Sequence, residues 1–89
     1  MQSHTTKQFR DLLDAAPADV RDKAKAAYAL WAANPSHPSL RFKKVHASLP
    51  IYSVRIDLDW RAVGVLREGG IVWFWVGPHR EYEKLLAKG

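Results

Sequence analysis

A segment with two prolines, Asn-Pro-Ser-His-Pro-Ser-Leu at residues 34–40, divides the chain into parts with different apolar periodicity. Before this segment, apolar residues recur at intervals of three and four, which is the spacing of one helix face. After it, apolar and polar residues alternate, which is typical of half-buried strands. Helices that precede a run of strands, rather than alternating with them, favour an α+β fold with an antiparallel sheet.

The first part of the chain predicts two helices that meet at Pro17. Thr5 or Thr6 can cap the first helix, whose apolar stripe consists of Phe9, Leu12, Leu13 and Ala16. Pro17 ends that helix or opens the next one. The second helix is expected from residue 18 to about residue 33, with an apolar face of Val20, Ala24, Ala27, Tyr28 and Trp31. Because Asn34-Pro35 stops it, the two helices should form a hairpin.

The second part predicts a strand meander and a closing helix. The strand candidates are residues 41–45, 51–60, 61–66 and 71–76, with a hairpin turn at Arg67-Glu68-Gly69-Gly70. Residues 79–87 predict a short amphipathic helix with Tyr82 on its inner face. Eighty-nine residues suffice for one domain. We therefore expect a single two-layer α+β domain over residues 1–89, with the hairpin packed on a three- to four-stranded antiparallel sheet.

Two helices can cover only one face of such a sheet, so the other face needs a separate explanation. Arg55 alternates with the apolar positions of its strand and is expected on the uncovered face, together with Arg61 or its neighbours. Strict alternation also puts Trp73 and Trp75 on one shared face. These two rings either pack in the core or form a stacking platform for bases beside a basic groove.

The charge of the chain is concentrated rather than diffuse. The formal net charge is +5, and no acidic residue occurs between Asp22 and Asp57. The basic residues in that stretch are Lys23, Lys25, Arg41, Lys43, Lys44 and Arg55. Such a segment indicates nucleic acid or an acidic protein as partner, or else a solvated basic face.

Several classes of protein are excluded by composition. The chain has no cysteine, and its four histidines are not spaced as metal ligands, so we expect no metal and no cofactor. Its longest apolar run is too short to span a bilayer. The first residues lack the pattern of a signal peptide. We therefore expect a cytoplasmic protein without a membrane partner.

Several short motifs occur in a fixed order along the chain. They are Asn34-Pro35 with His37-Pro38-Ser39-Leu40, Phe42-Lys43-Lys44-Val45, Ile51-Tyr52-Ser53-Val54-Arg55-Ile56, Trp60-Arg61-Ala62-Val63 and His79-Arg80-Glu81-Tyr82. Together with the element order, they resemble the RelE/ParE superfamily of type II toxin–antitoxin toxins, and the RelE-like members more than the ParE-like ones. The resemblance extends from about Phe9 to Leu86. Two departures are that only five residues precede the first helix, where members usually begin with a strand, and that a glutamate base has no obvious equivalent.

The resemblance implies a toxin that cleaves messenger RNA, associated with the ribosome, and so inhibits translation until a cognate antitoxin protein neutralises it. The implied enzyme is a metal-independent endoribonuclease that uses the RNA 2′-hydroxyl as nucleophile. The alternatives are a ParE-like inhibitor of DNA gyrase without nuclease activity, and a non-toxic relative. The fold is expected to be more certain than the function, since one fold hosts several activities.

The resemblance also implies a set of site residues. The expected catalytic residues are Arg61 at the scissile phosphate, His79 as general acid, Arg55 and Tyr82. The expected RNA-binding residues are Arg41, Lys43, Lys44 and Arg80, which would position phosphates. Each catalytic residue also has a structural alternative: an ion pair with Asp57 or Asp59 for Arg61, another cross-strand ion pair for Arg55, a helix start for His79 and core packing for Tyr82.

Overall fold

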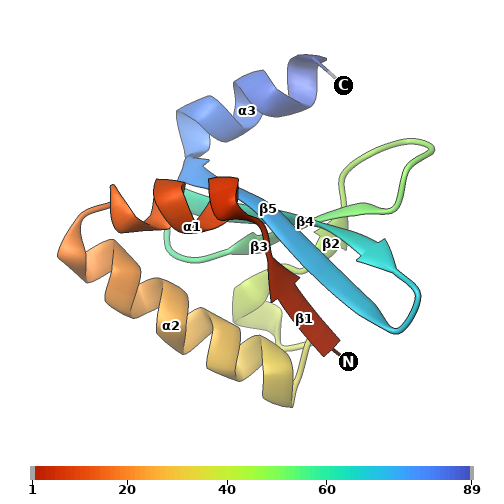
Figure 1. Ribbon diagram of the computed structural model, residues 1–89, viewed down its shortest axis with the longest axis horizontal. Coiled ribbons are helices and arrows are strands. Elements are labelled where there is room, and N and C mark those ends of the chain that lie inside the picture. Colours follow the sequence, from red (N-terminus) through yellow and green to blue (C-terminus); the bar gives the residue numbers. More distant parts are fainter. Residues whose placement is uncertain (1, 89) are drawn as a thin grey trace.

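The computed structural model describes residues 2–88 and contains one mixed sheet and three α-helices (Figure 1). The strands are β1 (Gln2–Thr5), β2 (Lys43–Lys44), β3 (Ile51–Arg55), β4 (Trp60–Arg67) and β5 (Gly70–Pro78). The helices are α1 (Lys7–Asp14), α2 (Ala18–Ala33) and α3 (His79–Lys88), with a 3₁₀ turn, η1, at Pro38–Leu40. The expected α+β class, helical hairpin and C-terminal helix are confirmed. No helix within the described range is long and apolar enough to cross a membrane.

The sheet has five strands in the order β1-β5-β4-β3-β2, so the expected count of three to four was too low. The strand that the sequence did not predict is β1, which pairs in parallel with β5 from Gln2 opposite Gly70 to Thr5 opposite Trp73. It consists of four polar residues at the sheet edge and therefore has no apolar alternation. Its pairing depends on the backbone of β5 and on a hydrogen bond that Trp73 Nε1 donates to Ser3 Oγ at 3.0 Å.

The helical hairpin follows the expected chemistry. Thr6 caps α1, and its hydroxyl accepts a hydrogen bond from the N–H of Phe9 at 3.1 Å. Figure 1 shows α1 and α2 joined by a short turn on one side of the sheet. The core on that side is built around Trp31 of α2. Its ring packs edge to face against the rings of Trp73 and Phe42, with centroids 5.4 and 5.8 Å away.

A β-bulge in β5 places its two tryptophans on opposite faces of the sheet. Val63 pairs with Trp75 and Gly64 pairs with Trp73, so Phe74 is the extra residue. Trp73 therefore packs under α2, whereas the Trp75 ring lies 6.5 Å from the ring of Tyr82 in α3. The expectation that the two tryptophans share a face was wrong, because strict alternation ignores an inserted residue.

Two strands are shorter than their sequence patterns suggest. The expected strand 51–60 ends at Arg55, and Leu58 is 74% exposed in the following loop. Asp57 ends the strand because its Oδ1 accepts hydrogen bonds from the N–H groups of Asp59 and Trp60, at 2.8 and 2.9 Å. The expected strand 41–45 reduces to Lys43–Lys44.

Candidate nucleic-acid interface

The sheet face opposite the helical hairpin carries a pair of adjacent arginines. Arg55 on β3 pairs directly with Arg61 on β4, and Arg61 pairs with Gly77 on β5. Directly paired residues project to the same face. Ser53 lies two residues before Arg55 on β3, and Trp75 lies two residues before Gly77 on β5. Because alternate residues of a strand share a face, Ser53 and Trp75 lie on the same face as the arginine pair. Arg55 therefore lies on the face that the helical hairpin does not cover, as expected, and Arg61 lies there too, although α3 packs on part of this face.

The guanidinium of Arg61 is held by backbone carbonyls of the β3–β4 loop. Its Nη1 donates hydrogen bonds to the backbone carbonyl oxygens of Asp57 at 2.7 Å, Trp60 at 3.0 Å and Leu58 at 3.4 Å. No carboxylate lies within ion-pair distance of either arginine among residues 2–88. The Asp57 carboxylate instead accepts a hydrogen bond from Lys23 Nζ at 3.3 Å. The ion-pair alternatives for Arg55 and Arg61 are thus not what the structure contains.

The positive charge at this pair is concentrated. Burial has the largest effect on the pKa of Arg61 and lowers it, and the charge of Arg55 lowers it further. Tyr82 and Asp57 raise this pKa and Arg41 lowers it, and the net shift is downward. The guanidinium remains the charged species at neutral pH. Two neighbouring arginines without a carboxylate partner form a suitable site for a phosphate, since each guanidinium can donate two parallel hydrogen bonds to an anion.

The basic residues around η1 and β2 divide between the two faces. Arg41 follows η1 in the left-handed backbone region, with φ of 47°, and its charge acts on Arg61. Lys43 pairs with Ser53 and so shares the face of the arginine pair. Lys44 pairs with Tyr52 and lies on the helix side. Of these three expected RNA-binding residues, the structure brings Arg41 and Lys43 toward the arginine pair and separates Lys44 from it.

The start of α3 is joined to the loop that holds Arg61. The N–H of His79 donates a hydrogen bond to the carbonyl oxygen of Asp59. The His79 ring lies 5.7 Å from the ring of Tyr82, and its Nδ1 is 3.0 Å from Oε1 of Glu83. His79 and Arg61 are therefore both anchored to the four-residue stretch between β3 and β4.

Tyr82 is more buried than its expected catalytic role suggests. The residue is 6% exposed, and its hydroxyl donates a hydrogen bond to Oγ of the equally buried Ser53 at 3.0 Å. This bond fixes α3 on β3. Arg80 is exposed and lies two positions before Tyr82, about 200° around the helix. It therefore points away from the sheet, and the structure does not bring it into the arginine cluster.

Sequence reasoning did not identify Ser53, Glu83 or the Asp57 loop as parts of the site. The spacing of His79 and Glu83 at i, i+4 is a usable signal for their contact. The partnership of Ser53 with Tyr82 joins residues 29 positions apart, and no local pattern predicts it. No cluster of three or more potential metal ligands occurs within the described residues.

Comparison with known proteins places this geometry in a family. A family model described as ParE-like toxin domain matches residues 18–84. Among curated proteins, none matches the chain in sequence.

Solved structures with the same fold include three toxins. The RelB-RelE antitoxin–toxin complex from Methanococcus jannaschii contains a chain with 17% identity and a TM-score of 0.74, with 92% of this chain and 96% of that chain covered. YafQ from Escherichia coli has 16% identity and a TM-score of 0.71, with 91% and 96% covered. The YoeB/ParE toxin from Agrobacterium tumefaciens has 14% identity and a TM-score of 0.69, with 89% and 99% covered. These likenesses show the fold, and the family model covers most of the chain, so the chain belongs to the ParE-like toxin family within the RelE/ParE superfamily.

Proposed function

We propose that this chain is the toxin of a toxin–antitoxin pair and that it cleaves messenger RNA in the ribosome, in the cytoplasm, until its antitoxin binds. The family supports a toxin. The relatives from Methanococcus jannaschii and the DinJ-YafQ proteins of Escherichia coli were solved as toxin–antitoxin complexes, which supports an antitoxin partner.

The observation that carries the nuclease proposal is the pairing of Arg55 with Arg61 on the sheet face opposite the helical hairpin. Like charges that lie directly opposite on neighbouring strands destabilise a sheet. A phosphodiester placed between the two guanidinium groups would relieve that repulsion. The two guanidinium groups would stabilise this phosphate most strongly in the transition state, where it becomes dianionic.

The proposed reaction is cleavage by the RNA's own 2′-hydroxyl. The 2′-oxygen bonds to phosphorus and its proton passes to water, while the bond from phosphorus to the 5′-oxygen breaks. Arg55 and Arg61 donate hydrogen bonds to the non-bridging oxygens, and His79 gives a proton to the departing 5′-oxygen. The products are a 2′,3′-cyclic phosphate and a 5′-hydroxyl end. Metal ions have no assigned step in this scheme.

The neighbouring residues have supporting roles in the proposal. The carboxylate of Glu83 lies 3.0 Å from Nδ1 of His79, where it can pair with the protonated ring and leave Nε2 available to the leaving group. Tyr82 acts as a positioning residue, because its hydroxyl is bound to Ser53 and its ring contacts His79. Arg41 and Lys43 would bind flanking phosphates, and Lys44 and Arg80 would make outer contacts with RNA or ribosome.

A second candidate function is inhibition of DNA gyrase without cleavage of RNA. The observation that favours it is the family model itself, which is described as ParE-like. Inhibition of gyrase would need the basic face for protein contact only, so it would not require His79. The two functions therefore differ in their dependence on this one side chain.

Inducible expression of the chain tests the proposal. We expect growth arrest and messenger RNA cleaved at defined positions, both lost in Arg61→Ala and His79→Ala. Arg67→Ala is the matched control, because Arg67 is exposed at the far end of β4. Growth arrest with intact transcripts and inhibited supercoiling would support gyrase as target. Harmless expression with intact transcripts would overturn both proposals and leave a non-toxic relative.

A further inference from the structure

The short loop between β3 and β4, residues 56–59, orients the side chain of Arg61. Three backbone carbonyl oxygens of this loop and of Trp60, at 2.7–3.4 Å, accept hydrogen bonds from Nη1 of Arg61. Among residues 2–88, no acceptor is bound to Nε or Nη2 of the same guanidinium. The edge formed by Nε and Nη2 is therefore free to donate two parallel hydrogen bonds to a phosphate.

The same loop also holds the start of α3. The carbonyl oxygen of Asp59 accepts a hydrogen bond from the N–H of His79, which is the first residue of that helix. A displacement of the loop would therefore move the proposed general acid and the proposed phosphate ligand Arg61 together. The conformation of four residues thus sets the distance between two groups that must act on one phosphodiester.

The carboxylate of Asp57 determines the conformation of this loop. Its Oδ1 accepts hydrogen bonds from the N–H groups of Asp59 and Trp60, at 2.8 and 2.9 Å, and so closes a turn. Its Oδ2 lies 3.3 Å from Nζ of Lys23 on α2. The Asp57 side chain is only 21% exposed. One carboxylate therefore shapes the loop and also connects it to the helical hairpin.

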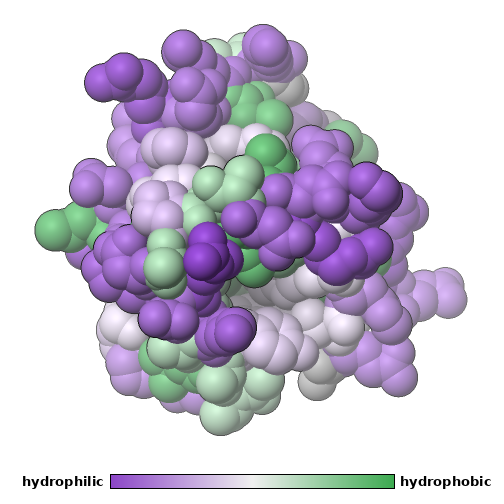
Figure 2. Space-filling model, turned by 60° about the vertical axis from the view of Figure 1, so that its left-hand side comes forward, coloured by the Kyte–Doolittle hydropathy of each residue, from purple (hydrophilic) through white to green (hydrophobic). Residues whose placement is uncertain are grey.

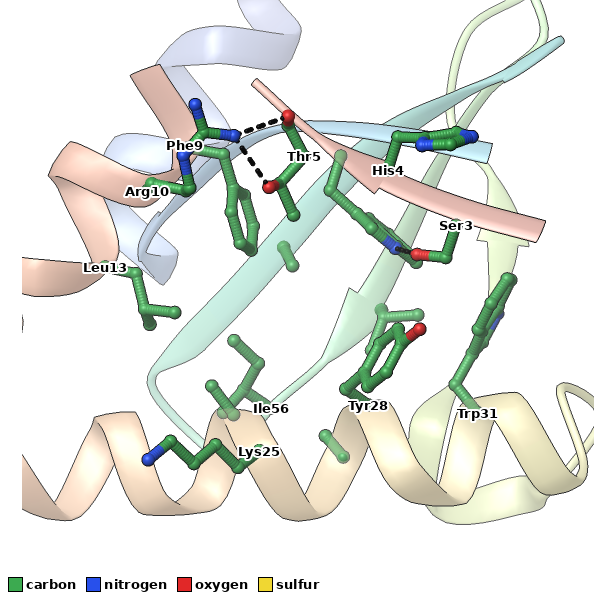
Figure 3. A pocket seen from close by; sticks show the side chains of 15 residues that line it. Ser3, His4, Thr5, Phe9, Arg10, Leu13, Lys25, Tyr28, Trp31 and Ile56 are labelled. Carbon is green, nitrogen blue, oxygen red and sulfur yellow. Dashed lines mark hydrogen bonds between the residues drawn. The ribbon is translucent and has the colours of Figure 1, made fainter. Parts of the chain in front are cut away.

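The loop meets α2 where apolar packing is incomplete. Ile56 directly precedes Asp57 and lies beside α2 (Figure 3). It lines two hollows next to that helix, with volumes of about 590 and 430 Å³. The space-filling view from the side of the helices shows a hollow of pale and green surface between hydrophilic side chains (Figure 2). Because space is left beside Ile56, apolar contacts alone do not hold the loop, and the ion pair of Asp57 with Lys23 is its polar connection to α2.

We propose that Asp57 is a positioning residue of the nuclease, whose carboxylate fixes the β3–β4 loop so that Arg61 and His79 have the geometry that cleavage needs. The inference rests on the proposed function. Asp57 itself forms no contact with the RNA in this role, and Lys23 makes a smaller contribution from α2. Loss of the carboxylate should therefore lower the rate of the bound complex and leave the affinity for RNA nearly unchanged, since the flanking phosphates keep their contacts.

Steady-state cleavage of messenger RNA on ribosomes by the full chain tests this role. We expect Asp57→Ala to lower kcat about 100-fold and to change KM by less than about threefold, because the reacting groups lose alignment rather than affinity. Asp57→Asn keeps an oxygen for the two N–H groups of the loop and should retain about a third of the parental kcat or more. Lys23→Met should have a similarly small effect, because a partly exposed ion pair contributes little.

The matched control is Asp22→Ala. Asp22 is an exposed carboxylate of α2 that forms no ion pair in the described part of the chain. The control removes the same charge as Asp57→Ala and should leave both kcat and KM at their parental values. Circular dichroism at the assay temperature confirms that each variant is folded.

Nuclear magnetic resonance gives a readout that does not depend on activity. In the parent chain, the Nε–H group of Arg61 should be as ordered as the backbone, because three hydrogen bonds hold its guanidinium. In Asp57→Ala, its heteronuclear NOE should fall to the value of Arg67, which is exposed. In Asp57→Asn and Asp22→Ala, it should stay at the parental value.

Four results would overturn the inference. They are parental kcat in Asp57→Ala, an equal loss of kcat in Asp57→Asn, an unchanged Arg61 signal in Asp57→Ala, and a raised KM with parental kcat. The last result would mean that Asp57 acts on RNA affinity. Failure of the proposed function is distinguishable, because the parent chain itself would then cleave no messenger RNA on ribosomes.

Discussion

Arg55 and Arg61 lie directly opposite each other on β3 and β4, on the sheet face that the helical hairpin does not cover. The pair has no carboxylate partner among the described residues. A folded protein that keeps two guanidinium groups in this arrangement gives up some stability. Retention of such a cost is typical of functional sites.

Neutralisation of one arginine should therefore stabilise the fold. We expect Arg55→Gln to raise the free energy of unfolding by about 0.5 kcal/mol at low salt, and to weaken RNA binding. The gain should shrink in high salt, because screening already reduces the repulsion in the parent chain. Urea denaturation at two salt concentrations measures the effect. A loss of stability at low salt would mean that Arg55 has a stabilising partner.

The hydrogen bond between Tyr82 and Ser53 should show strong coupling. Tyr82→Phe alone is expected to cost about 1–2 kcal/mol, because it leaves a buried hydroxyl of Ser53 without its partner. The double variant Tyr82→Phe with Ser53→Ala should cost less than the sum of the two single changes. Denaturation of the four chains provides the cycle. Simple additivity would contradict a direct hydrogen bond.

The carboxylate of Asp57 should make stability depend on acid pH. Burial raises the pKa of Asp57, but hydrogen bonds from the Asp59 N–H, from Lys23 and from the Trp60 N–H lower it by more, so the folded-state pKa is below the ordinary value. The stabilisation is therefore complete above the unfolded pKa of about 3.9 and is lost as the pH falls through the lower folded value. Asp57→Asn should cost about 1 kcal/mol at pH 7.

The same variant gives the pH test. The difference in unfolding free energy between the parent chain and Asp57→Asn should be constant from pH 7 to about pH 5 and shrink below about pH 4. A difference that grows on acidification would mean that the pKa of Asp57 is raised in the folded state.

The position of Gly64 should not accommodate any larger side chain. A Cβ at this position would lie 2.8 Å from the Trp73 ring and 3.0 Å from Ile71. We expect Gly64→Ala to cost about 1–3 kcal/mol through overpacking. Gly69→Ala is the comparison, because that position has open space and only its φ of 78° is unfavourable, at a cost of about 1 kcal/mol. Melting temperatures rank the two variants, and a milder effect at Gly64 would contradict the packing around the bulge.

The parts of the fold that depend on local periodicity were predictable from sequence. The hairpin of α1 and α2, the turn at Gly69 and the helix that begins at His79 all have local signals. β1 has no such signal, because its four residues are polar and its partner strand begins at Gly70. The extra residue at Phe74 is equally invisible, and one inserted residue was enough to move Trp75 to the other face.

For the candidate site, the sequence predicted which strands and which sheet face carry the arginines, but not the partners of their side chains. Alternation predicted Arg55, together with Arg61 or its neighbours, on the face that the helical hairpin does not cover, and in the structure both arginines lie on that face. The partners of these side chains were not predictable, because Arg61 uses backbone carbonyls rather than a carboxylate. The burial of Tyr82 on Ser53 depends on how α3 folds back over β3, which local sequence does not specify.

Mapping of 5′-hydroxyl RNA ends in cells that express the chain tests the central claim most directly. Attack by the 2′-hydroxyl predicts new 5′-hydroxyl ends within messenger RNA for the parent chain and for Arg67→Ala. It predicts that these ends fall by about 100-fold or more in Arg61→Ala, since a donor to the developing phosphate charge is lost. Ends of equal abundance in Arg61→Ala, or no new 5′-hydroxyl ends in cells arrested by the parent chain, would contradict it.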